Sequence, residues 1–94
     1  MKSIICAVLL ATTVVKQKGK AFSPSALTIK AGDTIEFEND DTITHNVFAK
    51  SEAAVFDLKQ QAPGAKSAAT FARPGVVEVR CAIHPGMKLV VTIQ

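Results

Sequence analysis

Apolar and polar residues alternate along most of this chain with the period of two that is typical of β-strands. Leu27 and Ile29 alternate with polar neighbours, and Ile35 and Phe37 do the same further along. The turn residues Ala31-Gly32-Asp33 separate the two segments. The pattern therefore predicts a hairpin or a tight corner with one face buried and one face in water.

The clearest alternation lies near the C-terminus. Residues 73–75, Arg-Pro-Gly, predict a turn, and Val77, Val79 and Cys81 follow on one face of a predicted strand. Successive side chains of a strand point to opposite faces, so the pleat should direct Cys81 toward the core. A last strand is predicted over residues 88–93.

The remaining segments complete an all-β pattern. Residues 12–18 read as a strand, residues 39–41 as a turn, and His45 opens another strand. Residues 49–66 have no clear period and are predicted to form a loop with at most one helical turn. No convincing amphipathic helix is present, so we expect an all-β, Greek-key β-sandwich of about seven to eight strands.

The N-terminus has the composition of a secretory signal peptide. A positive start, Met1-Lys2-Ser3, precedes an apolar run from Ile4 to Ala11 that is too short to cross a bilayer. We expect residues 1–11 to be a signal peptide or N-terminal apolar segment, and residues 12–94 to be the folded domain of an exported, periplasmic protein. The alternative is that residues 4–15 form a buried first strand of an uncleaved chain.

The composition limits the number of domains and the kinds of partner that this chain can have. The 94 residues suffice for one domain, and 48% hydrophobic with 20% charged residues is a globular composition. Lysine and arginine number 11 against 8 acidic residues, but they are scattered along the chain. Scattered charge argues against a nucleic-acid surface. We also expect a monomer without a transmembrane segment.

The candidate chemistry lies in one short segment. Cys81, His84 and Met87 fall within seven residues, and His45 is the only other histidine. Thiolate and thioether sulfur suit Cu(I), imidazole suits both copper oxidation states, and His₂Cys with a weak axial Met is the donor set of blue-copper sites. Strand ends at one pole of a sandwich could bring the four together.

Less specific interpretations stand beside this one. Taken singly, a buried cysteine is usually inert, a histidine is usually a surface or satisfied core residue, and Met87 could simply fill the core. A disulfide from Cys6 to Cys81 is disfavoured, because Cys6 lies in the apolar run and no cysteine framework is present. Structural zinc is possible, although methionine is a poor zinc ligand. A thiol enzyme lacks a third orienting group, so we expect no enzymatic activity.

Four segments together resemble the cupredoxins. They are residues 27–34, the triplet His45-Asn46-Val47, residues 71–75, and Cys81-x-x-His84-Pro85-x-Met87. The short ligand loop is most similar to that of amicyanin within the plastocyanin-like group. The resemblance implies one copper ion in a type 1 site, with His45, Cys81 and His84 as strong ligands and Met87 as the axial ligand. It also implies that Asn46 ties the His45 segment to the ligand loop.

The resemblance implies a function as well. We expect a small exported blue copper protein that passes single electrons between a donor and an acceptor redox protein docking near His84. Pro85 and Gly86 would form an apolar patch there, with Lys88 at its rim. The alternative is a periplasmic protein for copper handling or delivery. Ala82 departs from the family, whose members often have Thr or Ser after the cysteine.

Overall fold

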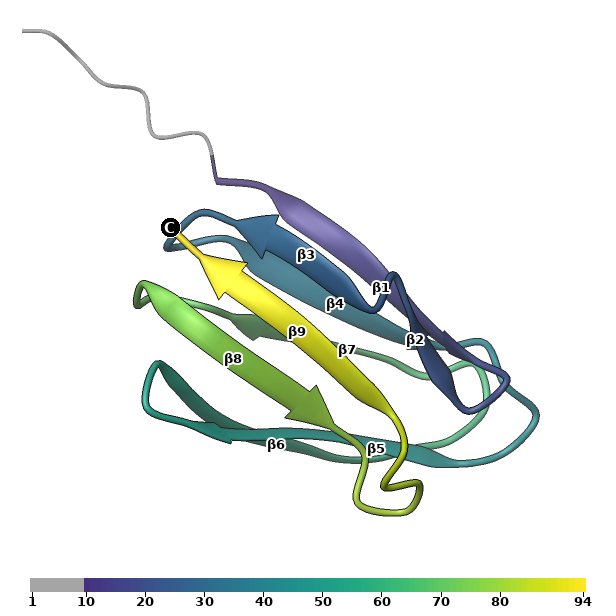
Figure 1. Cartoon of the computed structure of the whole chain (residues 1–94). Coiled ribbons are helices and arrows are strands. Elements are labelled where there is room, and N and C mark those ends of the chain that lie inside the picture. The colour runs from purple at the N-terminus through teal and green to yellow at the C-terminus, as the bar shows by residue number, and fades with distance from the viewer. Residues whose placement is uncertain (1–9) are drawn as a thin grey trace, which may run out of the picture.

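The computed structural model describes residues 10–94, which form two β-sheets packed face to face (Figure 1). The four-stranded sheet has the order β2-β1-β4-β7, formed by Ala21–Ser23, Thr12–Lys18, Thr34–Asn39 and Lys66–Thr70. The five-stranded sheet has the order β3-β9-β8-β5-β6, formed by Ala26–Ile29, Lys88–Ile93, Gly75–Arg80, His45–Ser51 and Ala54–Gln61. The predicted all-β Greek-key sandwich is confirmed, with nine strands among the described residues where about seven to eight were expected.

The turn between β3 and β4 is a corner and not a hairpin. β3 pairs in parallel with β9, whereas β4 pairs in parallel with β1, so the chain changes sheets at this point. Asp33 holds the corner, because its carboxylate accepts hydrogen bonds from the backbone N–H groups of Ala11 and Lys30, each at 3.0 Å. These two bonds lower the pKa of Asp33 below its ordinary value.

The prediction of a loop over residues 49–66 was wrong. β5 continues to Ser51, β6 occupies residues 54–61, and β7 begins at Lys66. β6 is an edge strand that pairs only with β5, and its inward residues Phe56 and Leu58 are only partly buried. An exposed Val55 and a register shift in the pairing with β5 further weakened the alternation in the sequence.

The core lies between the sheets, as the C-terminal alternation predicted. Val77 and Val79 of β8 and Leu89, Val91 and Ile93 of β9 all point inward and are buried. Phe37 packs against Phe22 and Phe56, and Phe56 meets Phe71 edge to face. Cys81 is only 1% exposed, so the strand pleat does deliver its thiol to the interior.

Two buried glutamines connect the sheets. Gln17 of β1 donates from Nε2 to Oε1 of Gln61 of β6 at 2.6 Å, and Gln61 Nε2 donates to the Phe37 carbonyl at 3.2 Å. Asn39 completes the contact by donating to the Gln61 carbonyl at 2.8 Å. A polar link between the layers therefore lies inside an otherwise apolar core.

The expectations for the N-terminus fall largely on residues 1–9, which lie outside the described residues, as does Cys6. Within residues 10–94, β1 begins at Thr12, and Leu10 is outside the strand and 64% exposed. Cys81 forms no disulfide within that range. None of these residues forms a helix long and apolar enough to cross a membrane.

Candidate metal centre

Strand pairing brings the predicted ligand segments to one end of the sandwich. β5 and β8 are antiparallel, with Phe48 opposite Arg80, so the start of β5 lies beside the end of β8. The loop that leads from β8 to β9 is at the end of the molecule opposite the C-terminus (Figure 1). His45 at the start of β5 therefore meets the residues that follow β8.

Three of the predicted site residues converge there. His45 Nδ1 lies 3.1 Å from His84 Nδ1, and Cys81 Sγ lies 3.9 Å from the first nitrogen and 3.8 Å from the second. His45 and Cys81 are buried, while His84 is half-buried. The two imidazole rings meet at an interplanar angle of 64°, with centroids 4.8 Å apart.

The three donor atoms fit a single metal ion. A circle through atoms at separations of 3.1, 3.8 and 3.9 Å has a radius of about 2.1 Å, against metal bonds of about 2.0–2.1 Å to histidine nitrogen and about 2.3 Å to cysteine sulfur. One ion can therefore contact all three donors from a point close to their plane. His₂Cys in a trigonal arrangement is the strong-ligand set of a type 1 copper site.

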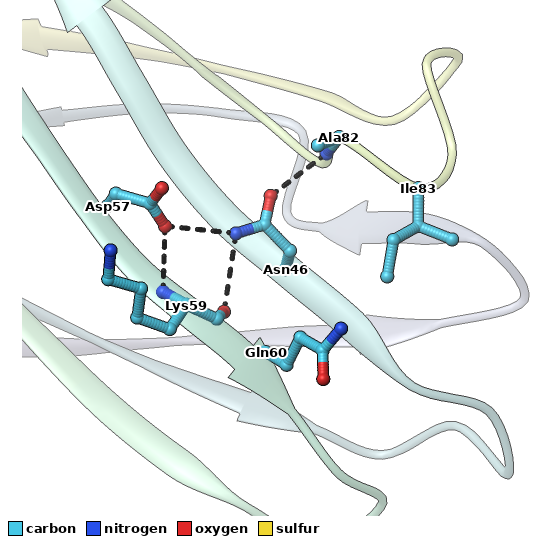
Figure 2. A pocket seen from close by; sticks show the side chains of 6 residues that line it. All are labelled: Asn46, Asp57, Lys59, Gln60, Ala82 and Ile83. Atoms are coloured by element: carbon cyan, nitrogen blue, oxygen red, sulfur yellow. Dashed lines mark hydrogen bonds between the residues drawn. The ribbon is translucent and has the colours of Figure 1, made fainter.

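Asn46 joins the His45 segment to the ligand loop through both its backbone and its side chain. Its N–H donates to Cys81 Sγ at 3.3 Å, and its Oδ1 accepts a bond from the Ala82 N–H at 3.0 Å. Figure 2 shows this side chain in a hollow that is also lined by Ile83 and by residues of β6. Its Nδ2 donates to Asp57 Oδ1 at 3.1 Å and to the Lys59 carbonyl at 3.3 Å. The loop is thereby fixed against two strands.

A carboxylate fixes the second ring nitrogen of His45. Nε2 of His45 lies 2.7 Å from Asp41 Oδ2, and because a carboxylate only accepts, Nε2 is the nitrogen that carries the proton in the neutral ring, which leaves the Nδ1 lone pair for a metal. Asp41 also accepts bonds from the N–H groups of Gly19 and Lys20, at 3.0 and 3.1 Å. The bond from His45, followed by those from Lys20 and Gly19, lowers the pKa of Asp41 to about 2.

Met87 closes the ligand loop. Its N–H donates to the His84 carbonyl at 3.0 Å, and its side chain is buried just before β9. Burial next to this loop is compatible both with an axial ligand and with core packing, so the axial role predicted for Met87 stays a prediction.

Sequence reasoning missed two features of this end of the molecule. Asp41 was assigned to a turn with Asn39 and Asp40, although an acidic residue four positions before a candidate ligand could have drawn attention to it. Ile83 is 46% exposed beside His84, where its place between ligands suggested no surface role. The contact between Asp41 and His45 and the exposure of Ile83 both depend on tertiary structure, which a single sequence does not show.

Comparison with known proteins agrees with this geometry. The family model of copper binding proteins, plastocyanin/azurin family, matches residues 10–94. Plastocyanin from Scenedesmus fuscus is 33% identical over 84 residues, covering 78% of this chain and 86% of that protein.

Solved structures show the same fold. Amicyanin from Paracoccus versutus superposes with a TM-score of 0.79 at 26% identity, over 88% of this chain and 81% of amicyanin. A copper-containing nitrite reductase from Thermus scotoductus superposes with a TM-score of 0.80 at 27% identity, over 87% of this chain but only 22% of the reductase. The family match spans nearly the whole chain and includes all the candidate ligands, so this protein belongs to the plastocyanin/azurin family of copper-binding proteins, the cupredoxins.

Proposed function

We propose that this protein carries single electrons at one type 1 copper site, with His45, Cys81 and His84 as strong ligands and Met87 as the weak axial ligand. The observation that carries the proposal is the convergence of two imidazole nitrogens and one thiol sulfur at a buried point. Bound copper would supply the one-electron chemistry by changing between Cu(I) and Cu(II).

The residues around that point hold it in one geometry. The Asn46 N–H orients the cysteine sulfur, the Asn46 side chain holds the loop at Ala82, and Asp41 holds His45. Ligands that are fixed by a surrounding shell move little when the charge of a bound ion changes, and a small reorganisation favours fast electron transfer. This rigidity suits a carrier.

His84 is the proposed exit for the electron. It is the least buried of the three convergent ligands, and it lies in a loop where Pro85 and Gly86 are exposed. With Ile83, these residues give the loop an apolar surface next to the metal centre, and Lys88 is exposed at its edge. A redox donor and acceptor would dock on this surface, and the protein would act as a monomer.

Copper handling or delivery is the second candidate, because it would use the same ligands. Burial of His45 and Cys81 favours a carrier, since a delivery protein needs an accessible metal. We propose no enzymatic activity either, because the similarity to a nitrite reductase covers only 22% of that enzyme.

Export is also part of the proposal. The positive start and apolar run of residues 1–11 support a signal segment, and any cleavage would fall near Ala11, before the first strand begins at Thr12. The folded domain would then be residues 12–94.

Voltammetry of the copper-loaded protein in the presence of a strong Cu(I) chelator tests carrier against delivery protein. A carrier should give a reversible one-electron wave and keep its copper through repeated cycles. Loss of copper to the chelator within a few cycles would contradict electron carriage and favour delivery.

A further inference from the structure

We propose that Asp41 is a positioning residue for His45 and that its carboxylate lowers the reduction potential of the copper centre by favouring Cu(II) over Cu(I). This inference rests on the proposed function, because it concerns the same metal site. It adds a residue that lies outside the donor set and that the sequence pattern did not single out.

The His45 ring is fully buried and lies between Asp41 on its Nε2 side and the convergent donors on its Nδ1 side. A ring held by a 2.7 Å bond to a carboxylate has one tautomer and one orientation. Asp41 therefore decides which nitrogen of His45 is available to a metal.

The Asp41 side chain cannot easily move away from His45. Its two oxygens accept bonds from Gly19 and Lys20, which form the turn between β1 and β2 and have left-handed φ angles of 62° and 57°. Its own N–H donates to Asn39 Oδ1 at 2.9 Å. The two backbone N–H groups of the turn thus fix the carboxylate, whose side chain is only 14% exposed, and the bond to Asn39 fixes the Asp41 backbone.

The negative charge of Asp41 would also act electrostatically on a bound copper ion. Oxidation of Cu(I) to Cu(II) adds one positive charge at the site, and a fixed anion nearby stabilises the more positive state. The carboxylate acts through the imidazole, and a partly buried charge is screened less by solvent than an exposed one. A neutral group at position 41 would lose this preference for Cu(II).

The chain offers a matched control. Asp40 is the adjacent residue and carries the same charge, but its side chain is 44% exposed and pairs with Lys16 at 3.7 Å. Asp40→Asn removes one negative charge near the site without removing the partner of His45. A general effect of net charge should appear in both variants, whereas an effect through His45 should appear only at position 41.

The experiment measures the reduction potentials of the copper-loaded wild type, Asp41→Asn and Asp40→Asn. Asparagine keeps one acceptor oxygen for the turn, and Asp41→Ser serves as a second variant if Asp41→Asn does not fold. We expect Asp41→Asn to favour Cu(I) over Cu(II) at least tenfold more than the wild type does. For a one-electron couple, a tenfold change raises the reduction potential by about 59 mV. Asp40→Asn should shift it clearly less.

A structural reading predicts something different. If Asp41 only holds the turn between β1 and β2, Asp41→Asn should lower the thermal stability of the metal-free protein and leave the potential at the Asp40→Asn value. That result would overturn the inference. Nitrogen NMR of His45 gives a readout independent of the potential, because Nε2 should be the protonated nitrogen in metal-free wild type and both tautomers should appear in Asp41→Asn.

Identical tautomer populations in the two proteins would also overturn the positioning role. A wild type that binds Cu(II) without a thiolate charge-transfer band would overturn the proposed function itself, together with the redox effect of Asp41. A wild type with that band, combined with equal potentials in Asp41→Asn and Asp40→Asn, would overturn the inference about Asp41 alone.

Discussion

At the scale of single residues, the site depends on which side chains touch the donor atoms and which only lie close by. Asn46 contacts Cys81 Sγ through its N–H, and Asp41 contacts His45 through its carboxylate, so each would act on the metal centre through a proposed ligand. Ala82 contributes only its backbone N–H to this network. The loop is held at this position without a side-chain hydroxyl, because Asn46 Oδ1 accepts from the backbone.

Met87 allows a direct test at this scale. Met87→Leu is a volume-conserving change, which usually costs less than about 1.5 kcal/mol of stability. If Met87 is the axial ligand, loss of its weak sulfur donor disfavours Cu(II). The reduction potential should then rise on the order of 59 mV, which corresponds to a tenfold change in the ratio of the affinities for Cu(I) and Cu(II). Voltammetry of the copper-loaded variant measures this.

Leu89→Met is the control for that experiment, since Leu89 is fully buried in β9, two residues after Met87, and the swap is of the same kind. It should leave the potential unchanged. A Met87→Leu protein with wild-type potential would show that Met87 is core filler.

At the scale of elements, the two sheets are joined by polar contacts as well as by apolar packing. Gln17 and Gln61 are both buried, and Gln17 Oε1 has no hydrogen-bond partner within residues 10–94. A buried amide that has lost its partner costs about 1–3 kcal/mol, whereas apolar replacement of both partners can be nearly neutral.

Gln61→Leu should therefore destabilise the metal-free protein by about 1–3 kcal/mol, because it leaves the Gln17 side chain without its bond. The double variant with Gln17→Leu should recover part of that loss. Urea unfolding monitored by circular dichroism measures both, with exposed Gln60→Leu as the control. The link has no role in stability if Gln61→Leu unfolds at the same urea concentration as Gln60→Leu.

The elements also show what a single sequence can and cannot predict. Strands β1, β4, β8 and β9 followed from alternation because one face of each is buried and the other is more exposed. β6 did not, because an edge strand with partly buried inward residues has a weak pattern. The β3 to β4 corner stayed ambiguous because sheet assignment depends on long-range pairing, with β9 in one case and β1 in the other.

The candidate site was predictable to a different degree. His45, Cys81 and His84 could be named because their chemistry is rare in this chain, which has two histidines and two cysteines. Asp41 could not, because Asp40 and Asp41 look alike in sequence and only the fold determines which of them faces His45. Residue type thus indicated the candidate ligands, while tertiary contacts were needed to find their partners.

At the scale of the whole molecule, the metal centre lies where distant parts of the chain meet. Its proposed ligands come from the start of β5 and the loop after β8, and the supporting bonds come from the β1 to β2 turn and from β6. A 94-residue domain has a limited core, so a metal that binds only the folded state should add to its stability. The whole sandwich can therefore be regarded as the scaffold that holds the metal centre at one of its ends.

The most direct test of that view is the electronic absorption and electron paramagnetic resonance spectrum of the protein with one equivalent of Cu(II). We predict an intense visible band from thiolate-to-copper charge transfer, lost in Cys81→Ser, because Cys81 Sγ and the two Nδ1 atoms share one coordination point. A colourless Cu(II) complex with the spectra of ordinary tetragonal copper would contradict a type 1 site in this protein.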